Sequence, residues 1–154
     1  MRLAWRRNAP TSAEPPRRLG VRMPVVETEF LLALRAGDRK HRAALAVFDR
    51  YPALELCAAA FLETAWLLRS KGKPPPEISL ALSILEAELE SRNVAEIAVT
   101  ASQIGRAHEI LSRHGLTFFD ALILANAEQS RDRRLISNDA SFDSTGTVQR
   151  IPLK

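Results

Sequence analysis

A chain of 154 residues is long enough for one well-buried domain and short for two. Hydrophobic residues make up 46% of it and charged residues 26%, and acidic residues interrupt the two longest apolar runs before either could span a membrane. The single cysteine, Cys57, excludes a disulfide within the chain. We therefore expect a globular, cytoplasmic protein with no membrane partner.

The net charge of +4 is concentrated in the first 22 residues, which hold six arginines against one glutamate. From Met23 onward the balance is −1, so the rest of the chain is nearly neutral. Residues 1–22 contain three prolines and no apolar segment of a secretory signal, which predicts a basic, disordered extension. Three interpretations stay open: an arm attracted to phosphates, translated sequence upstream of a true start at Met23, or an organellar transit peptide. One folded domain is expected over residues 23–154.

Hydrophobic periodicity and helix-ending residues predict an alternation of strands and helices after this extension. Glycines at 37 and 115 end helices, and the prolines at 74–76 break the chain between two of them. In chain order we predict a strand over 24–27, a helix over 29–36 capped by Thr28, a helix from Asp38 to before Pro52, a strand over 54–57, helices over 58–71 and 77–91, a strand over 94–99, helices capped by Thr100 and Thr117 that end at 114 and near 130, a strand over 134–137 and an edge strand over 148–151.

Strands that alternate with helices pair in parallel, because each crossover helix returns the chain to the same edge of the sheet. The predicted fold class is therefore α/β, a three-layer α/β/α domain with a parallel central sheet. The helix over 58–71 has Phe61, Leu62, Ala65 and Leu68 at core spacing, and we expect Trp66 in the core as well.

Four isolated acids, Glu27, Glu63, Asp120 and Asp139, lie in or at the edge of segments expected to be buried. Glu63 is the only charge between Leu56 and Leu68, and Asp120 is the only charge between Gly115 and Ala127. A carboxylate in apolar surroundings costs several kcal/mol, roughly, unless it is paired or binds a cation. Glu27 and Asp139 each follow a predicted strand, and ligand sites of open α/β sheets form outside those carboxyl ends. We expect the four carboxylates to converge there.

A hard divalent cation is the natural shared partner of four carboxylates, and Mg²⁺ or Mn²⁺ suits an all-oxygen site. A metal ion lowers the pKa of bound water, so such a site can hydrolyse a phosphodiester without a histidine, serine or cysteine nucleophile. Taken singly, each acid has a simpler interpretation. Asp120 stands three residues after Thr117 as in a capping box, Asp139 can begin a turn, and Glu27 can end a strand at the surface. Glu63 is the hardest to explain locally, because its neighbours on the helix offer no partner.

These acids and their order resemble the PIN domain, the metal-dependent ribonuclease fold that includes the VapC-type toxins. The resemblance covers residues 24–152 and rests on four motifs, PVVETEFLLAL, AAAFLETAWLLRS, GLTFFDALILANAE and RLISNDASFD. It implies that Glu27, Glu63, Asp120 and Asp139 are the catalytic and metal-binding residues. It further implies an RNA substrate, and an antitoxin protein and a second copy of the chain as partners. Apart from the resemblance, Ser137 and Asp143 are candidates for an outer shell around the metal.

The first motif departs from the family, which usually has Asp at position 27 and Asn at position 29, where this chain has Glu27 and Glu29. The extra methylene of Glu27 moves the carboxylate outward, and a misplacement near an ångström costs on the order of a hundredfold in rate. Two functions therefore stay open: an active ribonuclease, or a PIN-like scaffold that binds RNA or an antitoxin without cutting. A phosphatase of the D-x-D type is a weaker alternative, because that chemistry needs a nucleophilic Asp where this chain has Glu27.

Overall fold

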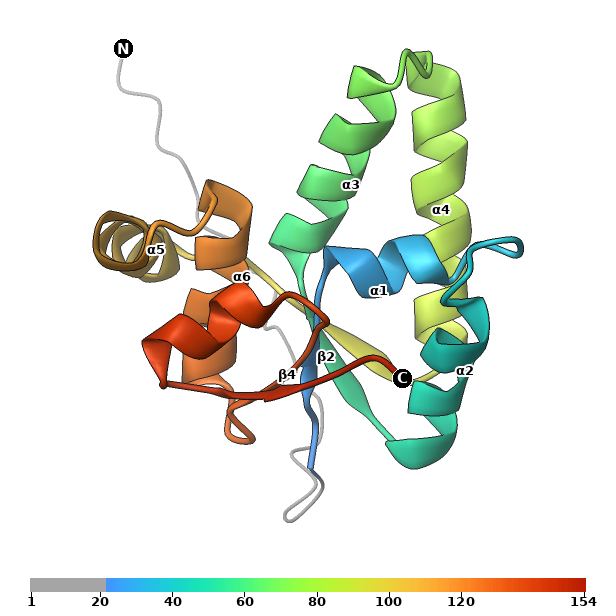
Figure 1. Cartoon of the computed structure of the whole chain (residues 1–154). Helices are drawn as coiled ribbons and strands as arrows, with labels where there is room; N and C mark the ends of the chain where they lie inside the picture. Colours follow the sequence, from blue (N-terminus) through green and yellow to red (C-terminus); the bar gives the residue numbers. More distant parts are fainter. Residues whose placement is uncertain (1–21) are drawn as a thin grey trace, which may run out of the picture.

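A computed structural model describes residues 22–154, and the extension predicted for residues 1–22 lies outside this range except for Arg22. Five strands and seven helices follow one another in this part of the chain (Figure 1). They are β1 (Val25–Val26), α1 (Thr28–Ala33), α2 (His41–Arg50), β2 (Leu54–Cys57), α3 (Ala58–Ser70), α4 (Pro75–Ser91), β3 (Val94–Ile97), α5 (Ala101–His114), α6 (Phe118–Gln129), β4 (Arg134–Ile136), the 3₁₀ helix η1 (Ala140–Thr145) and β5 (Gln149–Ile151).

The five strands form one parallel sheet in the order β3-β2-β1-β4-β5. β1 is central, and Val26 lies between Leu56 of β2 and Ile136 of β4. All three side chains are buried, because apolar residues of central parallel strands are covered by helices on both faces. The predicted parallel sheet is confirmed.

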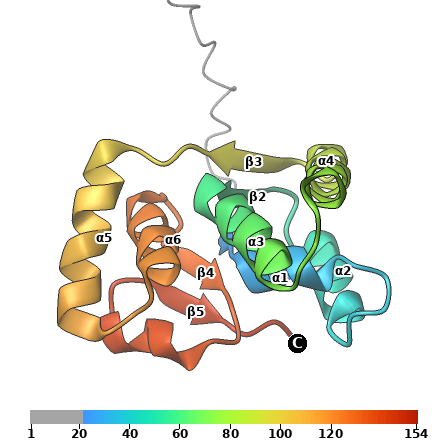
Figure 2. The ribbon, with the colours of Figure 1, turned by 90° about the horizontal axis from the view of Figure 1, so that it is seen from above.

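Helices cover the sheet on both sides, so the predicted three-layer α/β/α architecture is also confirmed. Figures 1 and 2 both show α5 and α6 on one side, and α2 and α4 on the other. α3 continues from the end of β2, and α4 returns beside it to begin β3. Pro75 and Pro76 occupy the first turn of α4, where a missing backbone N–H is harmless.

The chain changes direction across the sheet at β1. From β1 it passes through α1 and α2 to β2, and then to β3 on the same side; after β3 it passes through α5 and α6 to β4 on the opposite side of β1. The ends of β1 and β4 therefore lie at the topological switch point, where open α/β sheets bind their ligands.

Several predicted boundaries were wrong by a few residues. The first helix begins at Thr28 with Glu27 as its N-cap, because the Glu27 carboxylate accepts a hydrogen bond from the N–H of Glu29 at 2.7 Å. The second helix begins at His41 instead of Asp38, whose side chain accepts from the N–H of Lys40 in a turn before the helix. The helix η1 was not predicted.

Two apolar residues expected in the core are exposed. Trp66 is 58% exposed and Leu62 is 60% exposed, although both belong to a helix whose sequence is apolar all round. α3 packs against α1, α4 and α6 but leaves these positions uncovered, so periodicity alone assigned the wrong face. No helix in the described range is long and apolar enough to cross a membrane.

Candidate active site

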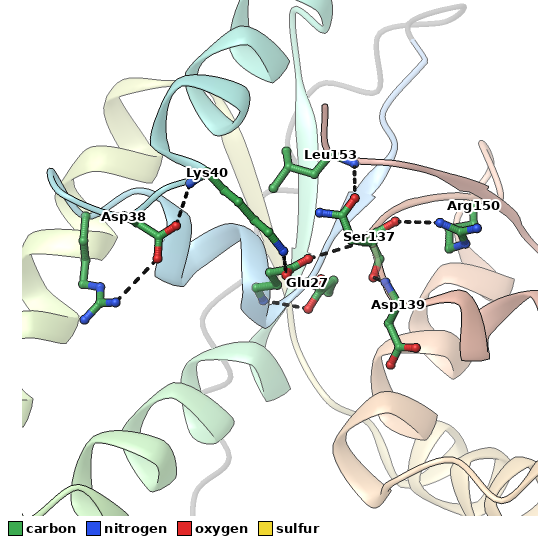
Figure 3. A network of polar contacts seen from close by, with 10 residues as sticks. Glu27, Asp38, Lys40, Ser137, Asp139, Arg150 and Leu153 are labelled. Atoms are coloured by element: carbon green, nitrogen blue, oxygen red, sulfur yellow. Dashed lines mark hydrogen bonds and ion pairs between the residues drawn. The ribbon is translucent and has the colours of Figure 1, made fainter.

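Glu27 and Ser137 leave neighbouring strand ends at the switch point, one residue after β1 and one after β4. Glu27 is only 7% exposed and Ser137 is 1% exposed. The Ser137 hydroxyl accepts a hydrogen bond from the N–H of Asp139 at 3.0 Å, and its position beside Glu27 lowers the pKa of that carboxyl. Ser137 therefore contacts the turn that carries the acid after β4 and lies near the acid after β1 (Figure 3).

Glu63 lies in the second turn of α3, and its partner comes from a different helix. The Thr28 hydroxyl donates to Glu63 Oε2 at 2.5 Å, which ties the first residue of α1 to α3. Thr28 is buried, so the hydrogen bond is sheltered from water. The sequence offered no local partner for Glu63, and the structure supplies one that is 35 residues away in the chain.

Asp120 lies in the first turn of α6 and is held by the residue that caps this helix. Thr117 accepts from the N–H of Asp120 at 3.2 Å and donates its hydroxyl to Asp120 Oδ2 at 2.5 Å. Thr117 is therefore the N-cap of α6 as predicted, while the reciprocal bond of a capping box, from the Thr117 N–H to the Asp120 carboxylate, is not formed within residues 22–154. The cap does not compete with a metal role for Asp120. The cap fixes the carboxylate instead.

Asp139 lies in the turn between β4 and η1 and is exposed. It is the N-cap of η1, because its Oδ1 accepts from the N–H of Ser141 at 2.8 Å. The turn interpretation from the sequence is therefore also correct. Within residues 22–154, the second carboxylate oxygen of Glu63, of Asp120 and of Asp139 accepts no hydrogen bond, which leaves one oxygen of each for another ligand.

The acids repel one another across the end of the sheet. The pKa of Glu27 is raised to about 7, mainly by burial; the charges of Glu29 and Asp120 add to the rise, while the Glu29 N–H and the Ser137 hydroxyl oppose it. Burial also raises the pKa of Glu63, to which the charge of Asp120 adds. The pKa of Asp120 is raised by burial and by the charge of Asp139. Asp120 thus lies within electrostatic reach of the other three acids.

The four carboxylates do not form a closed metal cage. In the described part of the chain, no group of three acidic, histidine or cysteine side chains is close enough to hold one ion. The donor set nevertheless suits Mg²⁺ or Mn²⁺, since all the donors are oxygens and self-repelling carboxylates gain from a cation. Mg²⁺ typically keeps several waters and binds one or two carboxylates directly, so a wider spacing is compatible with it. The role of the four acids as ligands stays a prediction.

Two polar residues expected around the acids have different contacts. Ser137 contacts both Glu27 and Asp139, as an outer residue of such a site would. Asp143 instead binds Arg150 through both carboxylate oxygens, at 2.9 and 2.7 Å, and points its charge into that ion pair. The charge of Arg150 lowers the pKa of Asp143 through these hydrogen bonds. Asp143 is therefore no member of the acid group.

A pair that sequence reasoning missed lies next to Glu27. Glu29 and Lys40 form an ion pair between α1 and the start of α2. The only sequence signal for it was Glu29 itself, at a position where the resembling family usually has Asn. Lys40 stands 11 residues later in a charged stretch and has no pattern that identifies it.

A family model matches residues 25–148 and is described as the PIN domain. The chain belongs to the PIN domain family. Its members are nucleases, generally ribonucleases. Comparison with curated protein sequences gives no match.

Solved structures of toxins share the fold. VapC20 of Mycobacterium tuberculosis, described as a sarcin–ricin loop cleaving toxin, is 27% identical with a TM-score of 0.65, over 81% of this chain and 96% of that one. A toxin–antitoxin complex from Klebsiella pneumoniae is 18% identical with a TM-score of 0.59, over 85% and 98%. VapBC2 of Rickettsia felis, bound to a promoter DNA fragment, is 17% identical with a TM-score of 0.61, over 84% and 98%. The last two show likeness of fold alone.

Proposed function

We propose that this PIN domain is a Mg²⁺- or Mn²⁺-dependent endoribonuclease that hydrolyses phosphodiester bonds in RNA. The proposal rests on one observation. Glu27, Glu63, Asp120 and Asp139 come from four separate elements, yet the charge of Asp120 raises the pKa of Glu27 and of Glu63, and the charge of Asp139 raises the pKa of Asp120. VapC20, the toxin with 27% identity, is described as cleaving the sarcin–ricin loop. A structured RNA loop is therefore the substrate class that we favour.

The four acids would hold the ion, which would lower the pKa of water and place positive charge at the scissile phosphate. The chain's own residues prepare this site. Thr28 and Thr117 each hold one carboxylate oxygen, so that Glu63 and Asp120 keep a fixed orientation. Without a cation the four carboxylates repel an RNA backbone, so binding of the ion and of RNA is mutually favourable.

A scaffold that binds without cutting is the second candidate, and Glu27 is the residue that favours it. Its pKa of about 7 leaves a large fraction of Glu27 protonated at neutral pH, and a protonated carboxyl is a poor ligand. Ionisation of Glu27 costs free energy that a cation must offset. An active site with this residue requires that the ion binds strongly enough to deprotonate it.

RNA cleavage with and without EDTA separates the two candidates. We expect purified protein to cut a hairpin RNA in Mn²⁺ and to leave it intact in EDTA. Asp120→Asn should keep the circular dichroism spectrum and abolish cleavage, because an amide cannot supply the charge that holds the ion. Asp49→Asn, the same change at an exposed site on α2, is the control and should cut normally. Cleavage that survives in EDTA or in Asp120→Asn would contradict the proposal.

Glu27→Asp tests whether the longer acid limits activity. If Glu27 is a tolerated but imperfect ligand, the shorter acid should preserve or raise the cleavage rate. Wild type that stays inert with every divalent ion, while Glu27→Asp cuts, would show a silenced enzyme and favour the scaffold. Loss of cleavage in Glu27→Asp would show that the site is rebuilt around glutamate.

We also propose an antitoxin protein as a partner, because the fold neighbours include toxin–antitoxin complexes. Co-expression with the product of the adjacent reading frame tests this. The expected result is a complex that purifies together and in which RNA cleavage is inhibited. Separate elution of the two proteins with undiminished cleavage would count against this partner.

A further inference from the structure

Glu29 is a fifth carboxylate at this edge of the sheet, and its two oxygens bind in different directions. Oε1 forms the ion pair with Lys40 Nζ, and Oε2 accepts a hydrogen bond from the backbone N–H of Asn138 at 3.4 Å. Asn138 immediately precedes Asp139. The Glu29 carboxylate therefore joins the beginning of α2 to the turn that carries the acid after β4.

Both ends of this connection are fixed by further contacts. Lys40 is the N-cap residue of α2, and its own N–H donates to Asp38 Oδ1 at 2.8 Å. The Lys40 side chain is 24% exposed and that of Glu29 is 33% exposed, so the ion pair is partly sheltered from water. On the other side, Asn138 Oδ1 accepts from the N–H of Leu153 at 2.9 Å. In Figure 3 the Lys40 side chain extends toward the end of β1, where Glu27 lies.

The Glu29–Lys40 ion pair also limits the negative charge beside Glu27. Glu29 lies two residues after Glu27 and would add a fifth negative charge beside it. Lys40 pairs with this carboxylate, so the Glu29–Lys40 pair as a whole adds no net charge beside Glu27. Both Glu29 oxygens are engaged outside the acid group, so Glu29 differs from Glu63, Asp120 and Asp139, each of which keeps one oxygen that accepts no hydrogen bond within residues 22–154.

We infer that Glu29 is a positioning residue and Lys40 its anchor, and that the pair holds the Asn138–Asp139 turn in place relative to Glu27. The inference rests on the proposed function, because it assigns the turn a role in presenting Asp139 to a cation. Glu29 itself is no ligand. Outer residues that orient ligands typically change metal affinity by about 10- to 100-fold when they are removed.

Lys40→Met distinguishes an anchoring lysine from one that only adds positive charge nearby, because the two roles predict opposite changes in Mn²⁺ affinity. Removing a spectator cation makes the site more negative and should tighten Mn²⁺ binding. Removing an anchor should weaken Mn²⁺ binding, on the order of tenfold. Lys40→Arg keeps a cation within reach of Glu29 and should retain near wild-type affinity. Lys73→Met, the same change in an exposed Lys–Glu pair on the α3–α4 connection, is the control and should change nothing.

Two measurements on the full chain make the test decisive. The first is Mn²⁺ titration by calorimetry with wild type, Lys40→Met, Lys40→Arg, Lys73→Met and the double variant Lys40→Met/Glu29→Gln. The second is amide hydrogen exchange at Asn138 and Asp139 in metal-free protein, which we expect to accelerate several-fold in Lys40→Met and to stay unchanged in Lys73→Met. The double variant should be no weaker than Lys40→Met alone, because the pair acts as a unit.

The outcomes distinguish the inference from the proposed function. If wild type binds no Mn²⁺, the proposed function fails, and the exchange rates still decide whether the pair holds the turn. If wild type binds Mn²⁺ while Lys40→Met binds it as tightly or more tightly with unchanged exchange, the inference fails and the proposed function stands. Weaker binding in Lys40→Met, with faster exchange and rescue by Lys40→Arg, supports both.

Discussion

Glu27 is a buried carboxylate at the end of β1, and its pKa is raised to about 7, mainly by burial. Its side chain also begins α1 by accepting from the N–H of Glu29. The same carboxylate therefore stabilises a helix start and carries a desolvation cost. That cost is the physical reason why an acid at this position calls for a cation.

The pKa of Glu27 predicts how stability of the metal-free protein depends on pH. Below pH 4.5 both the folded and the unfolded chain hold the proton; between 4.5 and about 7 the unfolded chain releases it while the folded chain keeps it. The free energy of unfolding should therefore fall as pH rises through this window, by about 3 kcal/mol from this group. Urea unfolding at pH 5 and pH 8 measures it.

Glu27→Gln should weaken the dependence of the free energy of unfolding on pH, because an amide does not titrate. Glu90→Gln, the same change at an exposed site on α4, should leave the slope as in wild type. Equal slopes in wild type and Glu27→Gln would show that Glu27 is ionised in the folded protein at all these pH values. The desolvation argument for a cation would then lose its basis.

At the scale of elements, helix caps place three of the four acids. Thr117 caps α6 and holds Asp120, and Asp139 caps η1 while it follows β4. Glu27 caps α1 in the same way. Helix N-termini stabilise negative charge, which partly offsets the burial that raises the pKa of Glu27 and of Asp120.

Thr117→Ala should lower both stability and cleavage. Loss of an N-cap costs about 1 kcal/mol, and Asp120 loses the hydroxyl that holds its Oδ2. Thr100→Ala is a matched control, since Thr100 caps α5 in a capping box with Gln103 and touches none of the four acids. We expect similar losses in thermal unfolding for both variants and reduced RNA cleavage only for Thr117→Ala. An equal loss of cleavage in both would mean that the effect comes from stability.

At the scale of the whole molecule, the exposed apolar side chains bear on assembly. Leu62 and Trp66 are exposed on α3, and the Trp66 ring lies 6.4 Å from that of Phe119, whose ring is 6.1 Å from that of Phe118 on α6. Exposed apolar patches of this kind mark interaction surfaces. The homodimer expected from the sequence stays a prediction, and this patch is where we place it.

Trp66→Glu tests that placement. Light scattering after gel filtration should give twice the chain mass for wild type and the single-chain mass for the variant, because a buried unpaired charge disrupts an apolar interface. Ile84→Glu changes another exposed apolar residue, on α4, and should remain dimeric. A monomeric wild type would contradict the dimer, and a monomeric Ile84→Glu with a dimeric Trp66→Glu would move the interface to α4.

The sequence by itself determined the strand and helix order and the parallel α/β class, because hydrophobic periodicity, caps and helix-ending residues act over a few neighbours. It also singled out four acids as candidate ligands. The predicted strand over residues 54–57 matches β2, and the Thr100 cap holds as predicted. Glu63 and Asp120 stood out because each was the only charge in an apolar run.

Only the tertiary structure decided which groups partner these acids and which apolar faces stay exposed. The contacts of Thr28 with Glu63 and of Lys40 with Glu29 join residues on different elements, and no local pattern encodes them. Trp66 was expected in the core and is exposed, because its exposure depends on where α4 and α6 pack against α3. Side-chain partners across elements follow from the sheet order and helix packing, which a spacing of residues along one helix or strand does not specify.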